Sequence, residues 1–197
     1  MEDSHEHCDH HDHASHIKYR TRWIFSLIFI PVCLFLIKPF LAKQLLNRAS
    51  SYSASFMYQD SIRQYKKGLF LDGDNSDGWI GLADVYKETG DVEDAINSYR
   101  KAVKAEPKNR RALYSLGMTL ALKKQQHEEA KKYWDKVREL GPESADERDR
   151  YILSYHRLSL QALVSYYKRM DEPEREAEAQ KELDSYYSDA KSADEKT

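Results

Sequence analysis

Apolar side chains recur with the period of an α-helix across residues 76–109. A first predicted helix carries them on one face, at Trp79, Leu82, Ala83 and Tyr86. A second predicted helix does the same with Ala95, Tyr99 and Ala102. Gly90 and Asp91 interrupt the pattern between the two helices, and Pro107 ends it. Small residues let two helices approach closely and large ones fill the gaps beside them, so the pattern predicts a helical hairpin.

The hairpin recurs with an offset of 34 residues. Residues 110–143 have the same arrangement with one inserted residue in the turn, and Ser61, Tyr65 and Gly68 stand 34 residues before Ala95, Tyr99 and Ala102. Residues 76–109 resemble the tetratricopeptide repeat, whose pattern is W-x2-L-G-x2-Y…A-x3-F…P. In this chain Ala83 takes the place of the Gly and Tyr99 that of the Phe.

The resemblance implies an all-α fold, a solenoid of helical hairpins over residues 44–187. The best repeats are residues 76–109 and 110–143, preceded by a degenerate repeat and followed by a fourth helical pair of weaker resemblance. The polar residues 188–197 are expected to form a disordered tail.

Residues 18–43 combine a basic collar with a predicted transmembrane helix. The collar is Lys18, Arg20 and Arg22, and residues 23–42 are apolar apart from Lys38. Twenty helical residues extend about 30 Å, the thickness of a hydrocarbon core. Apolar residues all round the helix, rather than on one stripe, favour a membrane span over a buried helix of a globular domain. The predicted architecture is therefore the solenoid preceded by one N-terminal transmembrane helix.

A cleavable signal peptide is the second alternative for this segment. The apolar stretch is longer than a usual signal core and the nearest small-residue triplet begins only at Ala49, which favours an uncleaved single-pass anchor. Basic residues lie on both sides of the segment, more tightly on the amino side. This distribution favours a cytoplasmic N-terminus, with the repeat domain on the opposite side of the membrane, the periplasmic side in a bacterium.

Composition narrows the classes of function. Of 197 residues, 31 are Lys or Arg and 33 are Asp or Glu, giving a net charge of −2. Neither residues 1–43 nor the remainder of the chain has the polybasic character of a nucleic-acid binder. The sequence contains no Gly-rich phosphate loop and no nucleophile with a suitable His partner. His156 lies in a helix where a packing or solvent-facing role is expected. We therefore predict a protein that is not an enzyme.

Residues 1–17 are rich in histidine and lack apolar periodicity, so this tail is expected to be disordered. Imidazole, thiolate and carboxylate groups bind Zn, Ni or Cu. The candidate ligands are His5, His7, Cys8, His10, His11 and His13. A structural zinc site usually has two ligand pairs separated by a folded span, whereas this is one compact run. A solvated tail whose histidines gain charge near pH 6 is the alternative.

In the tetratricopeptide repeat family the first helices of successive repeats line a groove that binds a partner. The resemblance implies that Ile80 and Asp84 of one repeat and Tyr114 and Met118 of the next face this groove. The predicted groove set is completed by Asp77, Lys87 and Arg111. The Lys and Asn clamp with which some members hold acidic chaperone tails is missing at these positions. Apolar residues with acidic neighbours suit an amphipathic helix or an extended apolar segment with some positive charge.

The leading hypothesis is a membrane-anchored scaffold or assembly factor for a membrane or envelope complex, which binds protein partners in this groove. A metal-delivery protein that works through its His-rich tail is the first alternative. A receptor on an organelle surface is the second. Partner, organism and oligomeric state stay open at this point.

Overall fold

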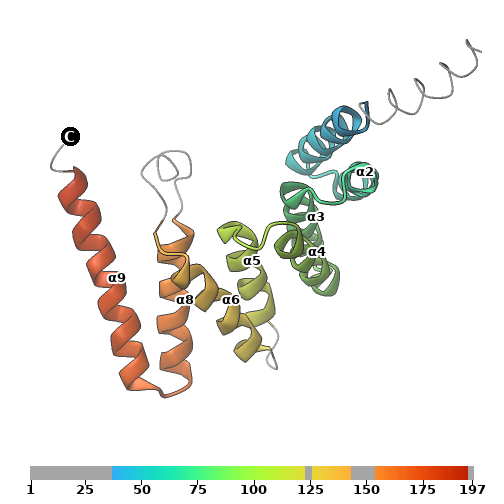
Figure 1. Ribbon diagram of the computed structural model, residues 1–197. Coiled ribbons are helices and arrows are strands. Elements are labelled where there is room, and N and C mark those ends of the chain that lie inside the picture. The colour runs from blue at the N-terminus through green and yellow to red at the C-terminus, as the bar shows by residue number, and fades with distance from the viewer. Residues whose placement is uncertain (1–36, 123–125, 143–153, 195–197) are drawn as a thin grey trace, which may run out of the picture.

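The computed structural model describes residues 37–122, 126–142 and 154–194. All secondary structure in these ranges is helical. The first helix spans residues 37–54 and is followed by α2 (Tyr58–Leu71), α3 (Ser76–Thr89), α4 (Val92–Ala105), α5 (Arg110–Ala121), α6 (His127–Glu139), α8 (Tyr155–Arg169) and α9 (Pro173–Asp194). Helices adjacent in the sequence pack as hairpins, and the hairpins follow one another in a solenoid (Figure 1).

Polar caps define where the repeated helices begin. The Asn75 side chain accepts a hydrogen bond of 2.8 Å from the backbone N–H of Gly78, and Asn109, 34 residues later, accepts one of 3.0 Å from Ala112. These bonds satisfy backbone donors that the first turn of a helix leaves free. Gly90 ends α3 with φ of 84°, a left-handed conformation that favours glycine. The caps explain the regular hairpin length.

The core follows the small-and-large pattern of the sequence. Ala83, Ala95, Tyr99 and Ala102 are fully buried between α3 and α4. In the next hairpin a Cβ added at Gly117 would lie 2.5 Å from Nε1 of Trp134, so the bare backbone there makes room for the indole ring. The predicted helical hairpins over residues 76–109 and 110–143 are therefore confirmed, with the insertion in the second turn at residues 123–125 outside the described residues.

Two helices of the structure extend across borders of the predicted segments. Helix 37–54 runs without a break through the predicted border at residue 43, so the end of the predicted span and the first repeat helix are continuous. At the other end α9 extends to Asp194, so the predicted tail 188–197 is helical over residues 188–194. Residues 188–194 include Ala190, Lys191 and Ala193, which have good helix propensity and continue the helix.

Most of the predicted membrane segment lies outside the described residues, which include only residues 37–42 of the stretch 23–42. Among the helices that the structure does describe, none is both long and apolar enough to cross a bilayer. The predicted span therefore stays a prediction. The same holds for the His-rich tail, since residues 1–17 are also outside these ranges.

Candidate protein-binding groove

The first helices of the hairpins line a groove made of three hollows. The first hollow, of about 710 Å³, lies between helix 37–54, α3 and the start of α5. The second, of about 340 Å³, lies between the end of α3 and α5, and the third, of about 280 Å³, between α5, α6 and α8. Tyr114 and Met118 line both the second and the third hollow, which are therefore adjacent. We refer to the three hollows together as the first-helix groove.

Six of the seven predicted groove residues line these hollows. Asp77, Asp84 and Arg111 belong to the first hollow, Lys87 to the second, and Tyr114 and Met118 to the second and third. Ile80 does not, because its side chain is fully buried in the hydrophobic core. The prediction that Ile80 faces a partner is therefore wrong. The side chain packs in the core, where it holds α3 in place, and it is not accessible to a ligand.

Asp84 is the centre of a polar cluster in the first hollow. One carboxylate oxygen accepts a hydrogen bond of 2.7 Å from Nη2 of Arg111, and the other accepts one from the Tyr99 hydroxyl. Burial alone would lower the pKa of Arg111, but the neighbouring Asp84 carboxylate outweighs this effect and the pKa is raised. Both charges are thus engaged within the fold, and the cluster connects α3, α4 and α5.

Tyr65 forms part of the floor of the first hollow. A Cβ at Gly81 would overlap its hydroxyl group, so the glycine lets the ring of α2 reach across to α3. Burial raises the pKa of Tyr65, and the Asp84 carboxylate raises it further. The Tyr65 hydroxyl therefore loses its proton less readily than that of an exposed tyrosine.

The second and third hollows are more apolar. Met118 and Leu122 expose 41% and 66% of their surface, although both side chains are hydrophobic. Tyr114 is half-buried and its ring lies 5.9 Å from that of Tyr155 at the start of α8. Exposed apolar side chains that gather in a hollow are typical of a protein-binding site.

Sequence reasoning missed the two ends of the groove. Helix 37–54 contributes the exposed polar side chains Lys43, Asn47 and Ser50, and α8 contributes Gln161, Ser165 and Arg169. The repeat offset could have found the first set, because Lys43, Asp77 and Arg111 follow each other at intervals of 34 residues. The α8 residues have no such signal, since the fourth hairpin departs from the spacing.

No cluster of three or more His, Cys, Asp or Glu side chains in the described part of the chain is arranged to hold a metal ion. The predicted ligands His5, His7, Cys8, His10, His11 and His13 lie outside the described residues. Binding of Zn, Ni or Cu by the tail therefore stays a prediction.

Comparison with known proteins identifies the repeat. A family model described as tetratricopeptide repeat matches residues 46–110 and again residues 80–145. The chain belongs to the tetratricopeptide repeat family. The matched residues include helices 37–54 to α6 in whole or in part, so the degenerate first hairpin is also a repeat of this family. No curated protein sequence matches the chain.

Solved structures share the tetratricopeptide fold. A crystal structure of MamA superposes with a TM-score of 0.63 at 18% identity, covering 88% of this chain and 95% of that one. The type III secretion translocator chaperone SycD of Yersinia enterocolitica has a TM-score of 0.57 at 20% identity, covering 66% of this chain and 94% of that one. In a second structure, with the same TM-score and identity and covering 65% and 93%, SycD is in complex with a peptide of the translocator YopD. At these identities the likeness extends to the fold alone.

The Tyr99 hydroxyl provides a pH test of the Asp84 cluster. Burial, followed by the charge and hydrogen bond of Asp84, raises the pKa of Tyr99 above its usual value of 10.0 in the folded state. A raised folded pKa contributes stability that is complete below pH 10 and is lost as the pH rises above it, by up to about 1.4 kcal/mol per pH unit for one group. We expect Tyr99→Phe to make the fall in unfolding free energy above pH 10 shallower, measured by urea unfolding at a series of pH values.

Tyr187→Phe, at an exposed position of α9, is the control for this series. Some dependence on pH remains in Tyr99→Phe, because burial also raises the pKa of Tyr65 and of Tyr114. Equal slopes for the wild type and Tyr99→Phe would mean that the Tyr99 hydroxyl ionises as easily in the folded state as in the unfolded chain.

Proposed function

We propose that this tetratricopeptide protein is a membrane-anchored scaffold or assembly factor that binds a segment of a partner protein in the first-helix groove. The observation that carries the proposal is the series of three hollows along helix 37–54, α3, α5 and α8, of which the second and third are adjacent. A groove of this length suits an extended segment or one amphipathic helix better than a small molecule. The complex of SycD with a YopD peptide supports a peptide-binding role by analogy of fold.

The groove is polar at one end and apolar at the other. This difference defines the chemistry of the partner segment that it would bind. In the first hollow Asp84 and Arg111 pair with each other, and Asp72 accepts a hydrogen bond from the Asn75 side chain. The charged lining residues that are exposed there are Lys43 and Asp77. Over α5 the exposed surface is that of Tyr114, Met118 and Leu122. The proposed occupant therefore presents polar or charged groups to the first hollow and apolar side chains to the second and third.

The role of the anchor rests on the apolar segment 23–42, which is long enough to cross a bilayer. Helix 37–54 continues from the end of this segment into the repeat domain, so anchoring would hold the groove close to the membrane. Partners at this position are subunits of a membrane or envelope complex. A cytoplasmic N-terminus with the repeats on the other side is the proposed topology, and protease protection of the repeat domain in intact cells tests it.

The groove is tested by affinity isolation of the full-length chain from detergent-solubilised native membranes. We expect wild-type protein to recover membrane-complex subunits and Tyr114→Ala with Met118→Ala to recover roughly tenfold less, because two apolar anchors of the groove are lost. Asn97→Ala is the matched control, at an exposed position of α4 outside the three hollows.

Tyr114 is half-buried, so its removal can also affect the fold. Met118→Lys serves as a second variant, since it changes the apolar hollow at a position with 41% of its surface exposed. Recovery of the same subunits in unchanged amounts by both groove variants would exclude the groove as the binding site.

A further inference from the structure

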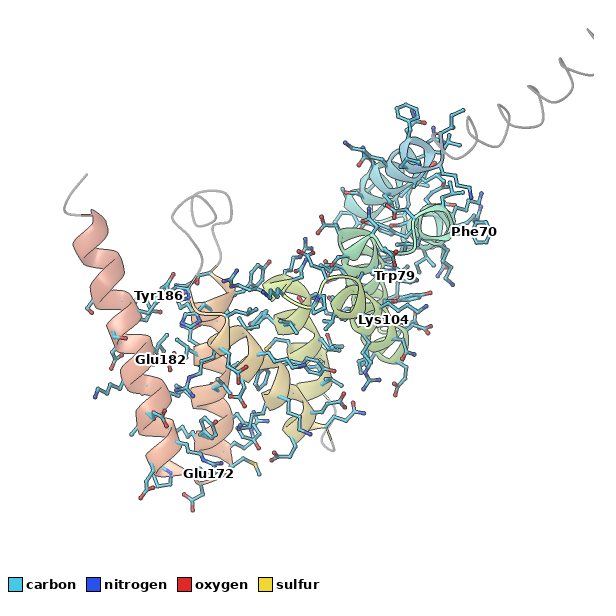
Figure 2. All side chains as sticks on the ribbon, in the orientation of Figure 1. Phe70, Trp79, Lys104, Glu172, Glu182 and Tyr186 are labelled. Carbon is cyan, nitrogen blue, oxygen red and sulfur yellow. The ribbon has the colours of Figure 1, made fainter. Side chains whose placement is uncertain are left out.

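The two helices of the first hairpin, 37–54 and α2, each expose large apolar residues close to the end of the predicted membrane segment. Phe70, near the end of α2, has 88% of its surface exposed, and Phe40, near the start of helix 37–54, has 63%. Figure 2 shows Phe70 projecting away from the neighbouring helices at the end of the molecule opposite α9. Ile37 and Leu41 are also exposed. Of these side chains, that of Phe70 is the least covered by the described part of the chain.

These residues belong to the same end of the hairpin. A Cβ added at Gly68 would lie 3.3 Å from the carbonyl oxygen of Ala42 and 2.8 Å from the Leu46 side chain. The last turn of α2 therefore packs directly beside the residue at which the apolar segment 23–42 ends. Phe70, two residues after Gly68, lies at the level where that segment meets the repeat domain.

The same hairpin is strongly basic. Residues 37–71 contain six Lys and Arg and a single acidic residue, Asp60, a net charge of +5 in a chain whose total is −2. On α2 the exposed residues Arg63, Lys67 and Phe70 are spaced by four and then three positions, so they form one stripe along the helix. A carboxylate oxygen of Asp60 lies 3.6 Å from Nη2 of Arg63. Lys67 has no acidic residue beside it on this stripe of α2. Aromatic rings beside basic side chains suit the headgroup region of an anionic membrane.

We propose that this end of the first hairpin lies on the surface of an anionic phospholipid bilayer, through the Arg63, Lys67 and Phe70 stripe of α2. The inference rests on the membrane anchoring put forward under the proposed function and adds a second contact to it. An anchor alone leaves the repeat domain free to rotate about the end of its helix. The second contact fixes the orientation of the first-helix groove relative to the membrane.

The experiment uses the full-length chain with Cys8→Ser and Cys33→Ser, and a single new cysteine labelled with an environment-sensitive dye. The labelled protein is placed in nanodiscs of phosphatidylcholine, or of phosphatidylcholine mixed with phosphatidylglycerol. We expect dye at Phe70→Cys to show a blue shift in the anionic discs that is reversed by salt, because surface electrostatics are screened. Dye at Met170→Cys, an exposed site near the end of α8, is the control and should show no shift.

A charge-reversal variant gives the specific test. Arg63→Glu with Lys67→Glu should abolish the blue shift of the Phe70→Cys dye while leaving the helical content unchanged, since both side chains are exposed. Lys66 is left in place because its ammonium group lies 5.6 Å from the centre of the Tyr86 ring.

The outcomes separate the two proposals. Protein that enters nanodiscs but shows no shift in either lipid overturns the bilayer contact and leaves the anchor intact. Protein that fails to enter nanodiscs overturns the anchor and the bilayer contact with it. A shift that depends on protein concentration overturns the lipid contact by showing that a second copy covers the surface. A shift that persists in the charge-reversal variant overturns the proposed recognition of anionic lipid by Arg63 and Lys67.

Discussion

Replacement of Ile80 with alanine is expected to lower the free energy of unfolding by about 2 to 5 kcal/mol, the usual cost of removing a large aliphatic side chain from a core. The side chain is fully buried in the core that joins the hairpins, so its loss removes apolar burial and leaves a cavity. Urea unfolding of the repeat domain in the full-length chain, followed by far-ultraviolet circular dichroism, measures the change.

Met118→Ala is the matched control, because it removes an apolar side chain of similar size that is 41% exposed. We expect it to change the unfolding free energy by less than about 1 kcal/mol. Ile80→Ala should conversely leave partner recovery per folded molecule unchanged. If Ile80→Ala changed the unfolding free energy only slightly but abolished partner binding, Ile80 would be a contact residue of the groove and not a core residue.

Substitution of Gly117 by alanine is expected to destabilise the protein by up to about 2 kcal/mol. The added methyl group would lie 2.5 Å from Nε1 and 2.8 Å from Cδ1 of Trp134, well inside van der Waals contact. Overpacking of this kind costs about 1 to 3 kcal/mol, and the better helix propensity of alanine offsets roughly 1 kcal/mol of it. Gly73→Ala is the control, since a Cβ there would meet only the carbonyl oxygen of Leu69 at 3.6 Å.

The preceding repeat suggests a second substitution that would restore the stability lost in Gly117→Ala. There Ala83 occupies the position that Gly117 has in the next repeat, and Tyr99 stands where that repeat has Trp134. The smaller ring leaves room for the methyl group, so Trp134→Tyr should cost less in the Gly117→Ala background than in the wild type. A double-mutant cycle measured by urea unfolding gives this interaction energy. Strict additivity of the two substitutions would mean that the indole ring can shift aside without cost.

The sequence predicts the hairpins well because the signals for them are local. Gly90 ends α3 in a left-handed conformation, Asn75 and Asn109 cap the helices that follow them, and the apolar spacing defines the packed faces. Each signal acts within one or two helical turns and recurs after 34 residues. Fold class and repeat boundaries could therefore be assigned before any contact was known.

Within the groove the prediction was less complete. Ile80 and Tyr114 stand 34 residues apart at the same place in the repeat, yet Ile80 is fully buried and Tyr114 is half-buried beside the third hollow. Periodicity gives the direction of a side chain around its own helix. The closeness of the next helix decides whether that direction leads into the core or into the groove.

The sequence by itself determined that this protein is a tetratricopeptide solenoid, because helix period, capping and the 34-residue offset are properties of the chain taken in order. Only the tertiary structure decided which charged residues of the groove are free. Asp84 bonds to Tyr99 and Arg111, which are 15 and 27 residues away, and is thereby engaged within the fold, whereas Lys43 and Asp77 remain exposed. Such pairing depends on distances between side chains of different helices, and these are set when the repeats pack.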